Sequence, residues 1–285
     1  MSGFSGNAGN AGNAGNAGNA GNAGLWGGLS VPHEETAADT SGQWQWIDNA
    51  AYPVAAWDPA LRAQLILGDF ALTNWKLTHL PKSTASVRDE IKKLLDLIPL
   101  RQARAGEIFG QAQNMELYWA NLLLANPQAR PKTATLIAVG VAVGQMVGMY
   151  WKDFHKAPRP VQVYPGIMPM ITAPGHASYP SNHSLQSHLI SFAITRALAP
   201  DGKGPLAAVV SRPAEALAFR IAKNREIAGV HFPADSAAGL HLARDIEGLL
   251  SGIESYKTLL GQVRDEWMQD SQPGLVVMPS LQQVK

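Results

Sequence analysis

The chain has 285 residues, of which 46% are hydrophobic and 16% are charged, so it can bury a sizeable core. Its formal net charge of +1 gives no reason to expect nucleic-acid or membrane-surface binding, so any anion site must come from a local cluster. There is no cysteine, which excludes disulfides, thiolate metal sites and a cysteine nucleophile.

The N-terminal arm is a low-complexity repeat. Residues 6–24 repeat the triplet Gly-Asn-Ala, and they contain no proline, so a collagen-like triple helix is not expected. Because the repeat offers almost no apolar surface to bury, we predict that residues 1–24 form a disordered arm. Residues 25–285 are predicted to form one domain, which is irregular up to Ala56.

Helical patterns dominate the chain after Ala56. Asp58–Pro59 is a typical helix start and predicts a helix to about residue 76. Ser86 precedes apolar residues at helical spacing, which predicts a second helix that ends at Pro99. Because the best strand signal, at residues 275–278, is weak, we expect an all-α fold with a single helical bundle. Further helices are predicted over residues 101–125 (one helix or two), 133–152, 184–198, 205–211, 213–226 and 235–269, the last with Gly252 as a point of kinking.

One predicted helix has the length of a membrane span. Residues 133–151 are uncharged and long enough to cross a bilayer. They also include two threonines, a glutamine and three glycines, and no second segment of this kind occurs in the chain. We therefore predict a buried helix of a soluble protein without transmembrane anchoring. The N-terminus lacks the basic and apolar regions of a secretory signal, so a cytoplasmic location is expected.

Three polar clusters lie between Lys152 and Asp235. The first begins at Lys152 and ends at Arg159–Pro160. Arg159 and Arg225 stay charged at any working pH, and their planar forks match the oxygens of phosphate. Any one of these cations, taken singly, is more often a surface charge. As a set they suit a phosphoryl transition state, whose charge is spread over three equatorial oxygens.

The second cluster is Pro180–Ser181–Asn182–His183, at a predicted junction between a loop and a helix. A helix N-terminus presents free N–H groups and the positive end of the dipole, so it favours an anion. Ser181 adds a hydroxyl donor, and His183 lies within reach of such an anion as a general acid or base. The alternative reading is a helix cap beside an incidental histidine.

The third cluster is Asn224–Arg225 followed by His231 and Asp235. His231 and Asp235 are four residues apart, so one helical turn would bring them together. A carboxylate on Nδ1–H would fix the tautomer and leave Nε2 to attack phosphorus or to coordinate a metal oxyanion. The alternative is a satisfied histidine near a helix start.

The other histidines are more often structural than functional, and among them only His176 is a further candidate, because it closely precedes the second cluster. No compact pair of histidine or carboxylate ligands recurs at zinc spacing on one helix, so we predict no metal site. The sequence leaves the oligomeric state open.

In this order, the three clusters resemble the signature of the type 2 phosphatidic-acid phosphatase and vanadium-dependent haloperoxidase superfamily. That signature is Lys-(six residues)-Arg-Pro, then Pro-Ser-Gly-His, then Ser-Arg-(five residues)-His-(three residues)-Asp. The resemblance covers residues of about 145–240, and the preceding helices look like those of soluble bacterial members. It implies a helical bundle of the acid phosphatase/vanadium haloperoxidase type. The matching positions are Lys152, Arg159, Pro160, Pro180, Ser181, His183, Arg225, His231 and Asp235.

Two positions depart from the signature. Asn182 replaces a glycine, and Asn224 replaces a serine. Asn182 keeps the backbone N–H, and asparagine is the non-glycine residue that best tolerates positive φ, so we expect activity to survive. The amide of Asn224 can still form hydrogen bonds.

The resemblance implies a role for each matching residue. His231 would be the nucleophile that forms a phosphohistidine, oriented by Asp235. His183 would protonate the leaving alkoxide and later activate water. No metal would be needed for hydrolysis. The equatorial oxygens would be held by Lys152, Arg159, Ser181, the Asn182 backbone and Arg225.

Three functions fit these roles. The first is a phosphatase acting without a cofactor on a small phosphorylated substrate, either a phosphate monoester or an anhydride. The second is a haloperoxidase, in which vanadate would be bound axially by His231 and would use peroxide to oxidise halide. The third is an oxyanion-binding protein without turnover. Because haloperoxidases of this type are generally much longer chains, the resemblance favours the phosphatase. A protonated His183 with a neutral His231 would give a bell-shaped pH profile on the acidic side.

Overall fold

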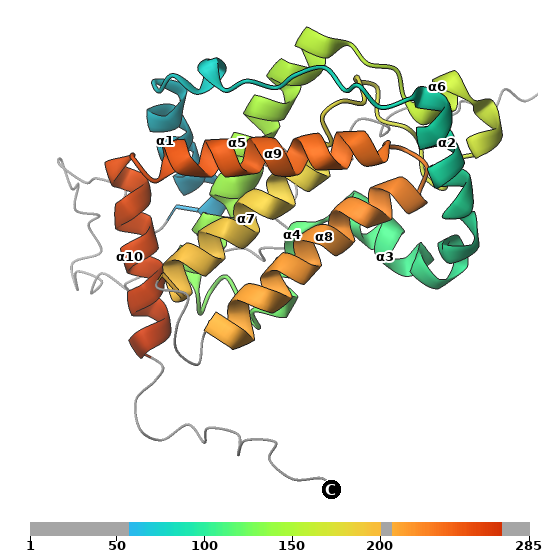
Figure 1. Cartoon of the computed structure of the whole chain (residues 1–285). Coiled ribbons are helices and arrows are strands. Elements are labelled where there is room, and N and C mark those ends of the chain that lie inside the picture. Colours follow the sequence, from blue (N-terminus) through green and yellow to red (C-terminus); the bar gives the residue numbers. More distant parts are fainter. Residues whose placement is uncertain (1–56, 201–206, 270–285) are drawn as a thin grey trace, which may run out of the picture.

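A computed structural model describes residues 57–200 and 207–269, and within those ranges the protein is all-helical (Figure 1). The expected all-α fold is therefore confirmed. The predicted disordered arm, the irregular segment up to Ala56 and the weak strand signal at residues 275–278 lie outside the described residues.

The centre of the bundle is α7 (Asn182–Leu198), which is buried along almost its whole length. It packs against α5 (Pro131–His155), α8 (Arg212–Ile227) and α9 (Pro233–Leu250), and Figure 1 shows it between these helices. A helix that is surrounded in this way needs apolar or satisfied polar residues on all its faces. The first turn of α7 is thus held in the interior, together with the ends of its neighbours.

The remaining helices cover this centre. The first pair, α1 and α10, packs on α5, and α10 also reaches α7. The α3 and α4 helices pack on α8, and α2 packs on α9. The covering helices are α1 (Pro59–Ala71), α2 (Val87–Asp96), α3 (Arg101–Gln113), α4 (Glu116–Leu122), the short α6 (Pro160–Val163) and α10 (Glu254–Gln269).

Close contact between α5 and α7 depends on three glycines of α5. A Cβ on Gly140 would lie 2.6 Å from the Ile190 side chain, and one on Gly144 would lie 2.6 Å from the Gln186 side chain. A Cβ on Gly148 would overlap the side chain of Asn182. The glycines follow one another at intervals of four residues, so they form one face of α5, which lets α7 approach closely.

Several predicted helix ends differ from the structure. The first helix ends at Ala71, and a separate 3₁₀ turn covers Trp75–Leu77. Residues 101–125 form two helices, and the helix expected over 235–269 is interrupted between Leu250 and Glu254 rather than kinked. Pro213 lies in the first turn of α8, where a proline costs no hydrogen bond.

The two predicted caps differ in outcome. The Asp58 carboxylate accepts from the backbone N–H of Ala60 at 2.8 Å, so the start of α1 is confirmed. The side chain of Ser86 forms no such bond at the start of α2. The nearby carboxylate of Glu90 is buried and accepts from the backbone N–H of Ala234 at 2.8 Å. It therefore stabilises the start of α9, which carries Asp235.

The apolar helix predicted over residues 133–152 is α5, and it is mostly buried. Among the described residues, one helical stretch, Pro131–Val163, is long and apolar enough to cross a membrane, and 67% of its most apolar window is buried inside the protein. A core helix of a soluble protein has the same character. The soluble state, the absence of a transmembrane anchor and the cytoplasmic location therefore stay predictions.

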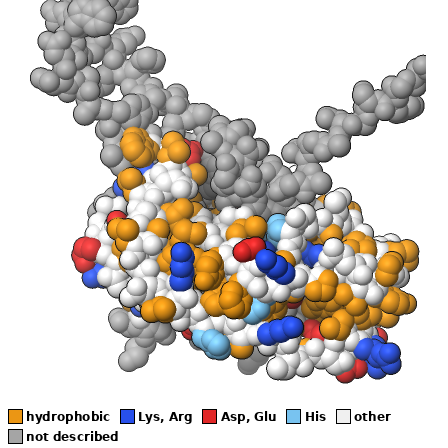
Figure 2. All heavy atoms as spheres, turned by 90° about the horizontal axis from the view of Figure 1, so that it is seen from above, with side chains coloured by type: hydrophobic (Ala, Val, Ile, Leu, Met, Phe, Trp, Pro, Cys, Tyr) orange, Lys and Arg blue, Asp and Glu red, His pale blue; other side chains and the backbone are white. Residues whose placement is uncertain are grey.

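Figure 2 shows one face of the protein, on which hydrophobic side chains gather in several groups between single basic and acidic ones. Charges of both signs are interspersed on this face, in keeping with the net charge of +1. No continuous field of one sign is seen on this face.

Candidate active site

The three sequence clusters meet inside one end of the bundle. The last turn of α5 carries Lys152, the first turn of α7 carries His183, and the last turn of α8 carries Arg225. The turn from α8 to α9 lies on the same side of the bundle as α2 and α6 (Figure 1). The sequence candidates are all buried there: Lys152, Arg159, Ser181, Asn182, His183, Asn224, Arg225, His231 and Asp235.

His231 and Asp235 form the predicted pair. Nδ1 of His231 lies 2.9 Å from Oδ2 of Asp235, and Nε2 lies 3.1 Å from Nη1 of Arg159. Because arginine can only donate, Nε2 carries a lone pair and Nδ1 carries the proton. Oδ2 of Asp235 also accepts from the Ser178 hydroxyl at 2.5 Å and from the Phe232 backbone at 2.9 Å. The carboxylate is thus fixed by three donors, and it orients the imidazole.

Arg159 is held beside His231 by several acceptors. Its Nη1 also donates to the Val230 carbonyl at 2.8 Å, and its Nε donates to the His176 carbonyl at 3.0 Å. Its Nη2 lies 3.1 Å from Nδ1 of His176. Because arginine can only donate, that ring nitrogen accepts, and its 3.2 Å approach to the Ala177 carbonyl is then a contact without a hydrogen bond. Arg159 therefore links His231 to His176, the further histidine that the sequence singled out.

Lys152 is a clamp on the loop that precedes α7. Its ammonium donates to the carbonyls of Ala177 at 2.8 Å, Ser178 at 2.8 Å and Pro180 at 2.5 Å. An ammonium has three N–H groups, so all of them are engaged by the backbone. In this arrangement Lys152 contributes its charge and holds the loop, and direct contact with an oxyanion would require it to release a carbonyl.

The start of α7 is fixed to α9. The backbone N–H of Ser181 donates to the Asp235 carbonyl at 3.0 Å, and the Ser181 hydroxyl accepts from the Ser184 N–H at 3.4 Å. Ser181 is therefore the N-cap of α7, as the sequence suggested. Beside this N-terminus lies His183, whose Nε2 is 3.3 Å from the carbonyl of Gln111.

The two asparagines that depart from the signature bind neighbouring helices. The amide of Asn182 donates to Gln145 of α5 at 2.9 Å, and Asn182 is not among the residues with positive φ, so its backbone is ordinary. The amide of Asn224 donates to Glu107 and to Gln111 of α3, both at 3.0 Å. Both side chains thus join helices.

The site has an excess of buried positive charge. Lys152, Arg159 and Arg225 are each at most 2% exposed, and the carboxylate of Asp235 acts on Lys152 and Arg159. Burial lowers the pKa of Arg159 and that of Arg225 to about 10, so both remain charged at neutral pH. Burial also lowers the pKa of Lys152, with Arg159 adding to the effect and Asp235 opposing it. Buried cations that outnumber the nearby carboxylates favour the binding of an anion beside them.

The histidines of the site are neutral at pH 7. Burial, followed by the charges of Arg159 and Lys152, holds the pKa of His231 well below its ordinary value. Burial and then Arg225 lower the pKa of His183 to about 3. The neutral His231 assumed for a bell-shaped pH profile agrees with this result, whereas the protonated His183 of the same profile requires a proton to be brought to its imidazole.

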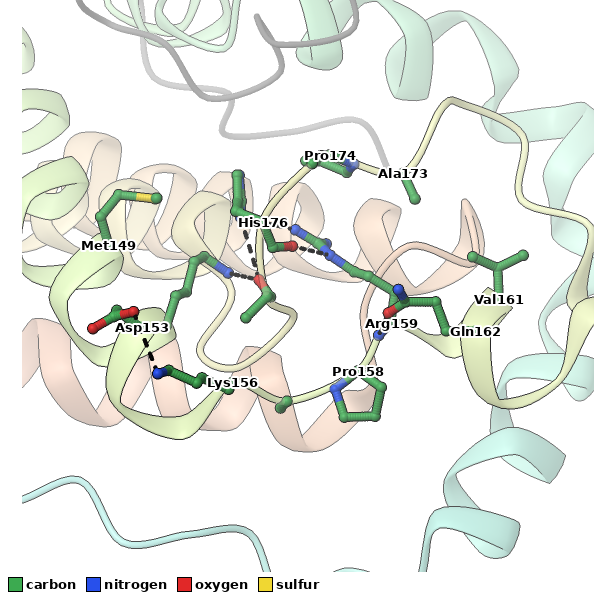
Figure 3. Close-up of a pocket in the computed structure, with 14 residues that line it drawn as sticks. Met149, Asp153, Lys156, Pro158, Arg159, Val161, Gln162, Ala173, Pro174 and His176 are labelled. Atoms are coloured by element: carbon green, nitrogen blue, oxygen red, sulfur yellow. Dashed lines mark hydrogen bonds and ion pairs between the residues drawn. The ribbon is translucent and has the colours of Figure 1, made fainter.

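A pocket of about 870 Å³ opens beside the site, between the end of α5, residues 157–162 and residues 173–177 (Figure 3). In Figure 3, Arg159 and His176 lie beside one another at this pocket and are joined by hydrogen bonds. His231 and His183 are not among its lining residues. Arg159 both lines the pocket and contacts His231, so it lies between the imidazole and the opening.

Some functional contacts have no signal in the sequence. Ser178 and Glu90 support Asp235 and the start of α9, and Gln111 contacts His183, yet none of them belongs to a spaced motif. Gln111 lies in α3, far from the clusters in the chain. Within residues 57–200 and 207–269, no group of three or more histidine or acidic side chains is arranged to hold a metal ion.

No family model matches the chain, and no curated protein sequence is similar to it. Similar solved structures include a transmembrane PAP2-type phosphatidylglycerolphosphate phosphatase from Bacillus subtilis. Its alignment has 15% sequence identity and a TM-score of 0.46, and it covers 70% of this chain and 96% of that chain.

Proposed function

We propose that the protein is a metal-independent phosphatase that hydrolyses phosphate monoesters or anhydrides through a phosphohistidine on His231. One observation carries this proposal. Nε2 of His231 bears a lone pair, its ring is fixed by Asp235, and it lies 3.1 Å from a buried guanidinium that can bind a phosphoryl oxygen. A nucleophile oriented by a carboxylate beside fixed cations is the arrangement that phosphoryl transfer needs.

In the first step, Nε2 of His231 attacks phosphorus, and the bond from phosphorus to the leaving oxygen breaks. His183 donates a proton to that oxygen, so the leaving group departs as an alcohol or as a protonated phosphate. The phosphorylated imidazole keeps Nδ1–H and is cationic, and the carboxylate of Asp235 stabilises it through the 2.9 Å hydrogen bond.

In the second step, water attacks phosphorus and the P–N bond breaks. Neutral His183 takes a proton from this water, and Nε2 of His231 regains its lone pair. The same two histidines thus return to their starting states, and the products are an alcohol, or a phosphate, and inorganic phosphate.

The charge that develops on the phosphoryl oxygens is met by the cations and by the start of α7. Arg159 and Arg225 provide donors, and the N–H groups of the first turn of α7, next to Ser181, add the positive end of the helix dipole. Lys152 acts through its charge and through the loop that it holds. Because these groups are fixed before the reaction, little reorganisation is needed.

His183 receives its proton with the substrate. In the empty site its pKa is lowered to about 3 by burial and by Arg225, so it is neutral at pH 7. A bound phosphate dianion brings two negative charges close to the imidazole and raises this pKa. A phosphate monoanion could also carry the proton in. The acid is thereby formed when substrate is bound.

Vanadate has the charge and shape of phosphate, so the haloperoxidase remains the second candidate. Nε2 of His231 would bind vanadate through its lone pair, and Arg159 and Arg225 would hold the vanadate oxygens. Bound vanadate would supply the chemistry of peroxide activation. The observation that favours the haloperoxidase is again the lone pair on Nε2 of His231. Because the same feature supports both candidates, an assay must separate them.

The test is a paired assay on the full chain. One half measures p-nitrophenyl phosphate hydrolysis in the presence of a chelator. The other half measures halide oxidation by peroxide after incubation with orthovanadate. His231→Ala is compared with His241→Ala, a matched control because His241 is an exposed histidine of α9.

Hydrolysis that is inhibited by vanadate, lost in His231→Ala and kept in His241→Ala supports the phosphatase. Vanadate-dependent halide oxidation with negligible hydrolysis supports the haloperoxidase. Silence in both assays, together with tight phosphate binding, would leave an oxyanion-binding protein without turnover.

A further inference from the structure

Gln111, in the last turn of α3, touches more of the site than its place in the chain suggests. It is 1% exposed and lies outside the three sequence clusters. Its backbone and its side chain contact three residues of those clusters, His183, Asn224 and Arg225. The α3 helix therefore reaches the oxyanion site through this residue.

The side-chain oxygen of Gln111 holds the end of α8. Oε1 lies 3.0 Å from Nδ2 of Asn224 and 3.4 Å from Nη2 of Arg225. Both partners are donors, so the amide cannot be turned around without facing N–H groups toward N–H groups. Nη2 of Arg225 also donates to the Ile108 carbonyl at 2.9 Å, so α3 fixes this edge of the guanidinium.

The backbone carbonyl of Gln111 holds the general acid. It lies in the last turn of α3, where carbonyls have no partner further along the helix. Nε2 of His183 lies 3.3 Å from it, and because a carbonyl only accepts, Nε2 carries a proton. The other ring nitrogen, Nδ1, must then be the atom that gives and takes the catalytic proton. The C-terminal end of a helix also favours a cationic imidazole.

Three buried nitrogens in this group have no partner among the described residues. They are Nε2 of Gln111, and Nε and Nη1 of Arg225. Buried N–H groups are almost always paired, and leaving them unpaired is costly. Oxygens of an anion would satisfy these three donors. The buried Oδ1 of Asn224 also has no partner among the described residues and is an acceptor, but the donors outnumber it, so the group favours an anion as the ligand.

We propose that Gln111 is a positioning residue of the oxyanion site, which holds Arg225 through its side chain and His183 through its backbone so that both face the bound phosphoryl group. Its role in turnover rests on the proposed function, but its role in anion binding does not. The ligand class is a tetrahedral oxyanion, for which inorganic phosphate is the probe.

The experiment uses Gln111→Leu and Gln111→Glu in the full chain. Phosphate affinity is measured by calorimetry, and the pH profile of hydrolysis is measured with the same samples. Gln113→Leu is the matched control, because Gln113 is a glutamine of the same helical turn that is exposed. Gln111→Glu has the shape of the native residue, so it keeps the test open if Gln111→Leu does not fold.

Gln111→Leu should weaken phosphate binding about tenfold or more, because Arg225 and Asn224 lose the side-chain acceptor and the guanidinium is then held by the Ile108 carbonyl alone. Gln111→Glu keeps the acceptor but adds a negative charge beside His183. It should weaken phosphate binding and move the alkaline limb of the pH profile upward by about one unit, since a nearby anion stabilises the imidazolium. Gln113→Leu should change neither quantity.

Native phosphate affinity in Gln111→Leu, or a native alkaline limb in Gln111→Glu, would overturn the proposal. The outcomes also separate the two proposals. If the native chain does not hydrolyse phosphate esters but Gln111→Leu binds phosphate more weakly, the phosphatase fails and the role of Gln111 in anion binding stands. If the native chain hydrolyses esters and Gln111→Leu binds phosphate normally, the phosphatase stands and the proposed role of Gln111 fails.

Discussion

Nη1 of Arg159 lies 3.1 Å from Nε2 of His231, so the atom proposed to attack phosphorus is in contact with the cation proposed to bind its oxygens. The guanidinium also reaches the pocket that opens to solvent. A substrate that enters from this pocket meets Arg159 before it meets His231. A phosphoryl oxygen would take over the hydrogen bond of Nη1, and this exchange would uncover the lone pair of Nε2.

Replacement of Arg159 tests this exchange. Arg159→Lys keeps a charge but loses the planar fork, so kcat/KM should fall about a hundredfold or more. Arg159→Gln should also raise the pKa of His231, because the guanidinium is the largest charge that lowers it. Hydrolysis rates and an NMR titration of the imidazole measure the two effects. Arg88→Gln, at an exposed arginine, should leave both unchanged, and an unaltered rate in Arg159→Lys would refute the exchange.

Lys152 should matter for the fold as well as for the site. In Lys152→Met, three backbone carbonyls near the start of α7 lose their donor. We expect a loss of about 2–4 kcal/mol in the free energy of unfolding, because buried acceptors are left unpaired. Urea denaturation measures this loss, with Lys92→Met at an exposed lysine as the control. Equal free energies of unfolding for the two variants would show that the three hydrogen bonds of Lys152 do not stabilise the fold.

Anion binding should be accompanied by proton uptake. At pH 7 the empty site holds His183 neutral, because its pKa is lowered to about 3, and a bound dianion raises that pKa. Up to about one proton should be taken from solvent for each dianion bound. Calorimetry in buffers of different ionisation enthalpy counts the protons. His183→Asn should abolish the uptake while still binding phosphate, and an uptake that persists in this variant would assign it to another group.

The acidic limb of the pH profile should belong to the His231–Asp235 pair. Burial raises the pKa of Asp235 to about 6, although Ser178 and the Phe232 backbone oppose the shift. As the pH falls through this value the carboxylate is protonated and no longer orients the imidazole, so kcat/KM should fall. In Asp235→Asn, kcat should fall by a factor of about a thousand or more. The decrease in kcat/KM near pH 6 should then be absent. A limb that remains in this variant would belong to a different group.

Gly148 and Asn182 should be coupled. Gly148→Ala places a Cβ against the Asn182 side chain, and we expect it to destabilise the fold by about 1–3 kcal/mol and to disturb the start of α7. Asn182→Gly removes that side chain and should restore much of the stability in the double variant. Thermal unfolding measures the coupling. Gly68→Ala is the control, because nothing lies within 4 Å of its Cβ, and strict additivity would contradict the predicted contact.

The sequence predicts much of the site, because the residues that carry charge and protons occur at fixed spacings. The four-residue interval between His231 and Asp235 predicted their hydrogen bond, and Ser181 was placed correctly at a helix start. Helical periodicity likewise predicted α5 and α7 to within a few residues. These features are local, so a pattern in the chain can express them.

What the sequence did not predict depends on packing between distant segments. Gln111 meets Arg225 only because α3 lies on α8, and Glu90 reaches the start of α9 only because α2 lies there. The low pKa of His183 was not predicted for the same reason. Burial by several helices sets its pKa, and no spacing in the chain reports burial.

The most direct measurement is to trap the covalent intermediate. The full chain is mixed with phosphate-labelled substrate, quenched with alkali, and digested, and the labelled peptide is identified by mass spectrometry. The account predicts a base-stable, acid-labile phosphoryl group on His231 that is absent from His231→Ala. Label on another residue, or full hydrolysis by His231→Ala, would contradict it.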